Sequence, residues 1–163
     1  LARARRGDAT RDELAALALD RAQPAIVRAT VFELMPPDAC AAIAPRAIAD
    51  PSPLVRSTAV ACAEPHVARA GLRDSVRLVR IEAARVLAGL RIDEPDRAAY
   101  AVARGELEDA YRLDLDRPEG WFNLATLAES ESRTTDAIAA YRRALALDPD
   151  YAPARDNLRR LER

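Results

Sequence analysis

Residues 118–150 read PEGWFNLATLAESESRTTDAIAAYRRALALDPD, and this stretch decides the fold of the chain. In its first half, apolar residues recur at intervals of three and four and share one face of a helix: Trp121, Leu124, Ala125 and Ala128. The second half repeats this spacing: Ala137, Tyr141 and Ala144. Pro149 follows and ends the second helix. The stretch therefore predicts a hairpin of two helices.

The same positions resemble a tetratricopeptide repeat, whose pattern over about 34 residues is W-x2-L-G-x2-Y, then A-x3-F, then P. The residues in register are Trp121, Leu124, Ala137, Tyr141, Ala144 and Pro149. Ala125 replaces the usual Gly and stays small, whereas Ala128 replaces the usual Tyr and removes a large contact. The resemblance implies a hairpin that packs against similar neighbours. It does not identify a partner, because these positions pack the repeat.

A second pattern runs through the first half of the chain. Val27-Arg28, Val55-Arg56 and Val79-Arg80 are 28 and 24 residues apart, and each Val has an apolar residue four positions later. Asp50 and Asp74 lie five residues before the second and third Val. Over residues 9–91 this resembles short HEAT repeats of the type found in phycobilin-lyase-like proteins. The resemblance implies that each Val is a core residue. It also implies that each Arg reaches an acidic group in a neighbouring loop and fixes the register of stacking.

Periodicity and helix-breaking residues predict the remaining helices, at 8–20, 25–34, 38–48, 50–63, 65–72, 74–90 and 93–115. Asp8 or Thr10 can cap the first helix, and Ser52 followed by Pro53 is a helix start signal. After Pro149 the chain repeats the start of the strong unit and ends one helix later, as a cap over the last repeat would.

We therefore expect an all-α fold, a right-handed α-α superhelical solenoid of helical hairpins. A single hairpin cannot bury its own apolar face, so neighbouring hairpins cover one another. The expected segments are HEAT-like repeats at 8–92, a bridging helix or degenerate tetratricopeptide unit at 93–117, a tetratricopeptide repeat at 118–150 and a C-terminal capping helix at 151–163.

Charge and length restrict the function. The net charge of the 163 residues is −1, which gives no electrostatic basis for binding nucleic acid. Residues 1–92 carry 14 Arg against 10 acidic residues, and residues 93–163 carry 11 against 16. We interpret this as variation between solvated faces; the alternative is end-to-end association of oppositely charged halves. No apolar run is long enough to insert into a membrane. The start at Leu1 suggests a piece of a longer protein.

Motifs that carry chemistry are missing from the sequence. His66 is the only histidine, and Cys40 and Cys62 lie on the two helices of one expected hairpin. Buried thiols are the favoured interpretation of the cysteines, and a disulfide is the alternative. Cys62 and His66 match a C-x-x-C-H haem site, but Pro65 occupies the position of the second Cys. We therefore predict no catalytic residue, cofactor site or metal site, and no enzymatic activity.

In the tetratricopeptide family the first helix of each repeat faces the concave side. The matching positions predict a partner-binding groove of Glu119, Phe122, Asn123, Thr126, Glu129, Tyr151 and Asn157. Some members clamp a carboxylate with Lys, Arg and Asn, but Phe122 and Thr126 replace such residues here. A mixed groove with an exposed Phe122 suits an extended or helical peptide. Alternatively these residues are merely solvated or face the rest of the parent protein.

The expected function is a non-catalytic scaffold for a protein or peptide partner, or for another domain of the same parent chain. HEAT-like repeats followed by a tetratricopeptide unit also resemble the C-terminal region of exported bacterial proteins with multihaem cytochrome c-type segments upstream. That resemblance implies an accessory docking domain in the periplasm; otherwise the location is cytoplasmic. A third alternative is a lyase-like HEAT enzyme, for which the sequence supplies no chemistry. The oligomeric state stays open.

Overall fold

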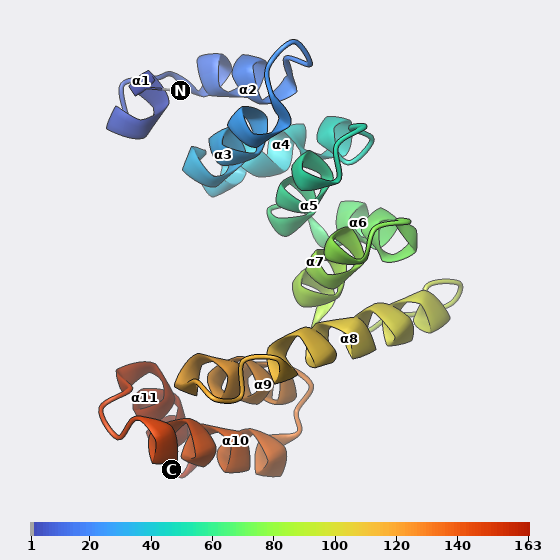
Figure 1. The fold of residues 1–163 in the computed structure, drawn as a ribbon. Coiled ribbons are helices and arrows are strands. Elements are labelled where there is room, and N and C mark those ends of the chain that lie inside the picture. Colours follow the sequence, from blue (N-terminus) through green and yellow to red (C-terminus); the bar gives the residue numbers. More distant parts are fainter. Residues whose placement is uncertain (1) are drawn as a thin grey trace.

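The fold is all-α, as predicted. In a computed structural model that describes residues 2–163, this range contains eleven α-helices, one 3-10 helix and no strand. The helices follow one another from one end of the molecule to the other, with the two termini far apart (Figure 1). Their bounds are α1 Ala2–Arg6, α2 Arg11–Leu19, α3 Ala25–Leu34, α4 Pro37–Ala47, α5 Pro53–Ala61, α6 Pro65–Ala68, η1 Arg69–Arg73, α7 Arg77–Leu87, α8 Arg97–Arg112, α9 Pro118–Ser130, α10 Thr134–Leu147 and α11 Ala152–Leu161.

Local signals set the helix starts. Thr10 caps α2 in a capping box: its hydroxyl accepts from the Glu13 N–H, and the Glu13 carboxylate accepts from the Thr10 N–H at 2.8 Å. Ser52 and Pro53 begin α5 as predicted, although the Ser52 side chain makes no capping hydrogen bond. The short α1 was not predicted, because five residues carry no measurable periodicity.

In the first half of the chain, α3, α5 and α7 pack side by side, and α2 and α4 pack against them. Their buried faces are small and β-branched: Val31, Val55, Ala59, Val79 and Ala83. Val55 and Val79 are therefore core residues, as expected, whereas Val27 is only half-buried. Small side chains let neighbouring helices approach closely, which explains a core built largely from Ala and Val.

A column of ion pairs runs along these helices, and we call it the Arg–carboxylate ladder. Its members are Arg28–Asp50, Arg56–Asp74, Arg80–Glu106 and Arg104–Glu131. The structural role predicted for the first three Arg residues is confirmed. The partner of Arg80 lies in helix α8 rather than in a loop, and the fourth pair, which reaches the end of α9, was not predicted.

Side chains of the ladder also form hydrogen bonds with backbone groups. Arg56 donates to the Asp50 carbonyl oxygen at 2.9 Å, and Arg80 donates to the Asp74 carbonyl oxygen at 2.8 Å. Asp50 and Asp74 in turn accept from N–H groups two residues further on, at 2.9 and 2.8 Å. Arg56 therefore contacts two successive connections, and Arg80 contacts one connection and helix α8, which fixes how one helix pair sits on the next.

The C-terminal part centres on the hairpin of α9 and α10, with α11 packed against α10. Its buried residues are Ala125, Ala128, Ala137, Tyr141, Ala144 and Ala154. Trp121 is half-buried and donates its Nε1–H to the Leu115 carbonyl oxygen at 3.0 Å. Leu124, expected in the packed face, is only half-buried, whereas Leu127 is buried and packs into the cluster that contains α7 and α8. The helix α9 therefore packs on both sides.

Gly89 lies close to the backbone at the end of α9. Its φ is +78°, and a Cβ there would lie 2.4 Å from the Ser130 carbonyl oxygen. Gly7 has a similar φ of +76°, but a Cβ at that position would meet no atom within 4 Å. A substitution at Gly7 therefore introduces conformational strain alone, whereas one at Gly89 introduces strain and a steric clash together.

Gly89→Ala is therefore expected to destabilise the protein by at least about 2 kcal/mol more than Gly7→Ala, which should cost about 1 kcal/mol. The left-handed conformation penalises both variants, and only the first also displaces the backbone of α9. Urea unfolding followed by circular dichroism measures both. Equal losses would show that the Gly89–Ser130 contact is unimportant.

Candidate functional site

Several residues of the predicted groove come together, but they bind one another. Glu129 accepts a hydrogen bond from the Tyr141 hydroxyl at 2.9 Å and pairs with Arg160. Asn157 donates its Nδ2–H to the same hydroxyl at 2.9 Å. Since these residues come from α9, α10 and α11, the network ties the three helices together.

Phe122 is half-buried rather than exposed, which corrects the prediction. Its ring packs edge-on against Tyr151, with centroids 5.6 Å apart, and tilted against Tyr141 at 5.8 Å. Aromatic pairs at these separations attract beyond the area that they bury. The aromatic cluster therefore stabilises the turn into α11.

The other three groove residues are separate from this network. Glu119 and Asn123 are half-buried, and one carboxylate oxygen of Glu119 is buried without a hydrogen-bond partner among the described residues. Thr126 donates to the Asn123 carbonyl oxygen at 2.9 Å and lines a different hollow, described below. Of the seven groove residues, four therefore take part in internal contacts among α9, α10 and α11 with its N-cap, and three lie outside those contacts.

The Tyr141 phenol is fully buried, and burial together with the Glu129 carboxylate raises its pKa to about 12. Because the folded-state pKa lies above the ordinary value of about 10, neutral Tyr141 stabilises the fold fully below pH 10. That contribution is lost as the pH rises through the folded-state pKa.

Tyr141→Phe is expected to lower the free energy of unfolding by about 1–2 kcal/mol at neutral pH, because Glu129 and Asn157 lose their shared partner. The difference from wild type should shrink as the pH rises past about 10. Urea unfolding across this pH range measures it. Tyr100→Phe is the control, since the half-buried Tyr100 hydroxyl makes no hydrogen bond within residues 2–163. A Tyr141→Phe variant as stable as the control would contradict the prediction.

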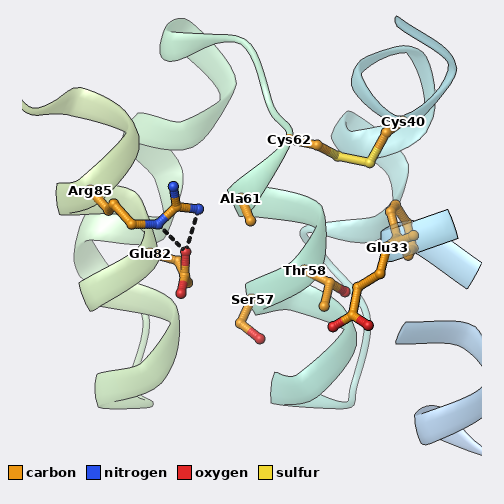
Figure 2. A pocket seen from close by; sticks show the side chains of 9 residues that line it. Glu33, Cys40, Ser57, Thr58, Ala61, Cys62, Glu82 and Arg85 are labelled. Atoms are coloured by element: carbon orange, nitrogen blue, oxygen red, sulfur yellow. Dashed lines mark hydrogen bonds and ion pairs between the residues drawn. A yellow bond between two sulfur atoms is a disulfide. The ribbon is translucent and has the colours of Figure 1, made fainter. Parts of the chain in front are cut away.

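The first hollow is an open cavity of about 270 Å³ over α5, between α3 and α7 (Figure 2). Its lining is Phe32, Glu33, Cys40, Ser57, Thr58, Ala61, Cys62, Glu82 and Arg85. The cavity exists because α5 presents small residues where its neighbours present long ones. The hydroxyls of Ser57 and Thr58 donate to carbonyl oxygens of their own helix, so the floor offers few free polar groups.

Cys40 and Cys62 form a disulfide at one end of this cavity, so the favoured interpretation of two buried thiols is wrong. Cys40 lies in α4 and Cys62 caps α5, and their Cα atoms are 5.9 Å apart, within the range that a disulfide requires. The sequence predicts that both cysteines lie on one hairpin, but it does not give the distance between them. His66 is exposed at the start of α6.

Three charged side chains border the first hollow. Glu82 and Arg85 lie one turn apart on α7 and form an ion pair at 2.7 Å. Glu33 is exposed on α3 and, among residues 2–163, makes no ion pair and no side-chain hydrogen bond. Figure 2 shows Glu33 extending toward α5 from one side and the Glu82–Arg85 pair on the other.

A second hollow, of about 160 Å³, adjoins the first at Arg85. Its lining is Arg85, Ala88, Leu107, Tyr111, Thr126, Leu127 and Ser130, from α7, α8 and α9. The two hollows therefore follow one face of the molecule from α3 to α9. The row of small residues on α5 is a signal that could have indicated the first hollow from the sequence.

Ion pairs within the chain neutralise part of the charge difference between residues 1–92 and residues 93–163. Arg69 pairs with Asp96 at 3.3 Å, Arg73 pairs with the same carboxylate, and Arg80 pairs with Glu106. The basic surplus of the first half thus meets acidic residues of the second within one molecule. The last segment, 132–163, carries seven Arg against five acidic residues, so the net acidic charge of the second half does not lie at its C-terminal end.

Within residues 2–163, no group of His, Cys, Asp and Glu has the arrangement of a metal site. None of the helices in this range combines the length and the apolar character that a membrane span needs. Comparison of the chain with models of protein families, with curated proteins and with solved structures finds no match.

Proposed function

We propose that this chain is a non-catalytic scaffold that holds a segment of another polypeptide, from a separate protein or from its own parent chain. We further propose a right-handed superhelix, with HEAT-like pairs at 8–92, a bridging unit at 93–117, a tetratricopeptide unit at 118–150 and a capping helix at 151–163. The regular spacing of the ladder and the burial of the Ala–Tyr face in α9 and α10 support this architecture.

One observation carries the binding function: the two hollows that meet at Arg85. Their linings together come from α3, α4, α5, α7, α8 and α9, so a peptide lying along them would contact several successive helices. Their linings mix apolar, hydroxyl and charged groups, as binding surfaces for polypeptides do.

The test is selection of peptides from a phage-displayed library against the wild-type protein. Peptides that bind should lose at least about tenfold in affinity for Ala61→Phe, which fills the first hollow, because the lost contacts are replaced by a clash. Ala101→Phe, at an exposed position of α8 outside both hollows, is the matched control. Isothermal calorimetry measures both affinities.

The groove predicted from the sequence is the alternative binding surface, and Asn123→Ala tests it. Peptides that bind Ala61→Phe normally but lose affinity for Asn123→Ala would assign binding to the groove residues predicted from the sequence. If selection against the wild-type protein enriched no more peptides than selection against the Ala61→Phe variant, the scaffold proposal would be contradicted.

The disulfide favours a second candidate, an accessory docking domain of an exported protein. Disulfides persist in oxidising compartments such as the periplasm and are rare in the cytosol. Alkylation of thiols in intact cells, followed by mass spectrometry, tests the location. Modified Cys40 and Cys62 would assign the protein to a reducing compartment and remove the support for this candidate.

A further inference from the structure

We propose that the hollow over α5 receives a Lys or Arg side chain of the bound polypeptide, with Glu33 as its carboxylate partner. This inference rests on the proposed scaffold function and specifies the chemistry of the partner. It follows from the shape of the hollow, from its charge and from the position of Arg85.

The shape suits a long side chain with an apolar stem. The floor consists of Ser57, Thr58 and Ala61, and the disulfide lies at one end. Phe32 adds apolar surface to the lining. Because the floor hydroxyls are already bonded to backbone, a methylene chain can cover them without stranding a polar group. Lys and Arg bury such stems while keeping the charged head at a rim.

The charge of the hollow is complementary to a cation. Its rim holds two carboxylates, Glu33 and Glu82, and one guanidinium, Arg85. Arg85 neutralises Glu82, so the carboxylate of Glu33 is the charge left without a cation among the described residues. A basic side chain entering between α3 and α7 would gain a charge-assisted hydrogen bond that an apolar or acidic one could not.

Arg85 acts as an internal competitor. Its side chain is 47% exposed, and it contacts Glu82 from the next turn of the same helix. Such exposed pairs are weak, so an incoming cation can share or replace Arg85 at Glu82. Removing the guanidinium while keeping an apolar stem should therefore strengthen binding of basic peptides, an effect that general damage to the surface would not produce.

The experiment uses four pools of immobilised nonapeptides, with Arg, Lys, Met or Glu fixed at the centre and the other positions randomised. The wild-type protein should be retained about threefold more on the Arg and Lys pools than on the Met pool. Glu33→Gln should abolish this preference, and Arg85→Met should increase it about threefold. Glu162→Gln, at the C-cap of α11 and outside both hollows, is the matched control and should behave as wild type.

The outcomes separate the two proposals. Retention of all pools without a basic preference, or a preference that survives Glu33→Gln, would overturn the role of Glu33 and leave the scaffold function intact. No retention of any pool above that seen with Ala61→Phe would overturn both. Circular dichroism of each variant confirms that Glu33→Gln and Arg85→Met, both at exposed positions, keep the helical fold.

Discussion

Arg28→Ala is expected to lower the free energy of unfolding by about 3–5 kcal/mol. Arg28 and Asp50 are only 4% and 6% exposed, and they form a bidentate ion pair between α3 and the connection before α5. Removing the guanidinium leaves the buried carboxylate with only the exposed Arg21, 4.0 Å away, as a cation. That poorly compensated buried charge, rather than the lost attraction alone, gives the effect its size.

Urea unfolding of wild type and variant measures this loss. Arg91→Ala is the matched control, because the Arg91–Asp93 pair is 89% and 59% exposed and should contribute less than about 0.5 kcal/mol. The double variant Arg28→Met with Asp50→Leu removes both charges and should recover much of the loss. If Arg28→Ala and Arg91→Ala were equally stable, the Arg28–Asp50 pair of the ladder would have no structural role.

The pH dependence provides an independent check. Burial acts most strongly on Asp50 and raises its pKa, but hydrogen bonds from Arg28 and the Ser52 N–H together outweigh burial, so the pKa lies below its ordinary value. A depressed folded-state pKa contributes stability that is present above pH 4, approximately the unfolded value, and lost as the pH falls. The difference between wild type and Arg28→Ala should therefore shrink below about pH 4, where Asp50 accepts a proton.

Removal of the disulfide is expected to lower the free energy of unfolding by about 3 kcal/mol. The bond joins residues 22 apart in the chain, and a loop of this length restricts the unfolded ensemble by about that amount. Cys40→Ala combined with Cys62→Ala tests the prediction without a reductant, and wild type in dithiothreitol tests it without a substitution.

Agreement between those two measurements would assign the loss to the cross-link itself. A loss below about 1 kcal/mol in both would show that α4 and α5 are held together by packing. The peptide pools add a functional reading, because the disulfide forms one end of the first hollow. Weaker retention after reduction, with helix content unchanged, would connect the cross-link to the shape of the hollow.

Local features of the fold could be predicted from the sequence, because caps and periodicity act within a few residues. The helix at 25–34 and the start of α5 at Ser52 and Pro53 were predicted correctly. The resemblance to HEAT repeats assigns Arg28, Arg56 and Arg80 a structural role, and the ion pairs of all three residues agree with it. The fourth pair was overlooked because Ala103 replaces Val before Arg104, although the 24-residue interval continues.

Features that depend on distances between helices could not be predicted. The disulfide requires a Cα separation that spacing along the chain does not give. The tetratricopeptide resemblance places Phe122 on an exposed concave face, yet the chain after α10 returns and places Tyr151 against its ring. The small residues of α5 can be read from the sequence, but the hollow also requires the longer side chains of α3 and α7 beside them, and that arrangement follows only from the packing of three helices.

The contact of α7, α8 and α9 has a mechanical consequence. Leu107 and Leu127 belong to the same buried cluster as Val79 and Leu87, and Arg80 pairs with Glu106 across the boundary at residue 92. Cutting the chain there would divide a core rather than a linker, and each fragment would expose apolar surface. A load applied at one end is therefore transmitted to the other without a hinge at this boundary, so a segment held near α3 keeps its position relative to α9.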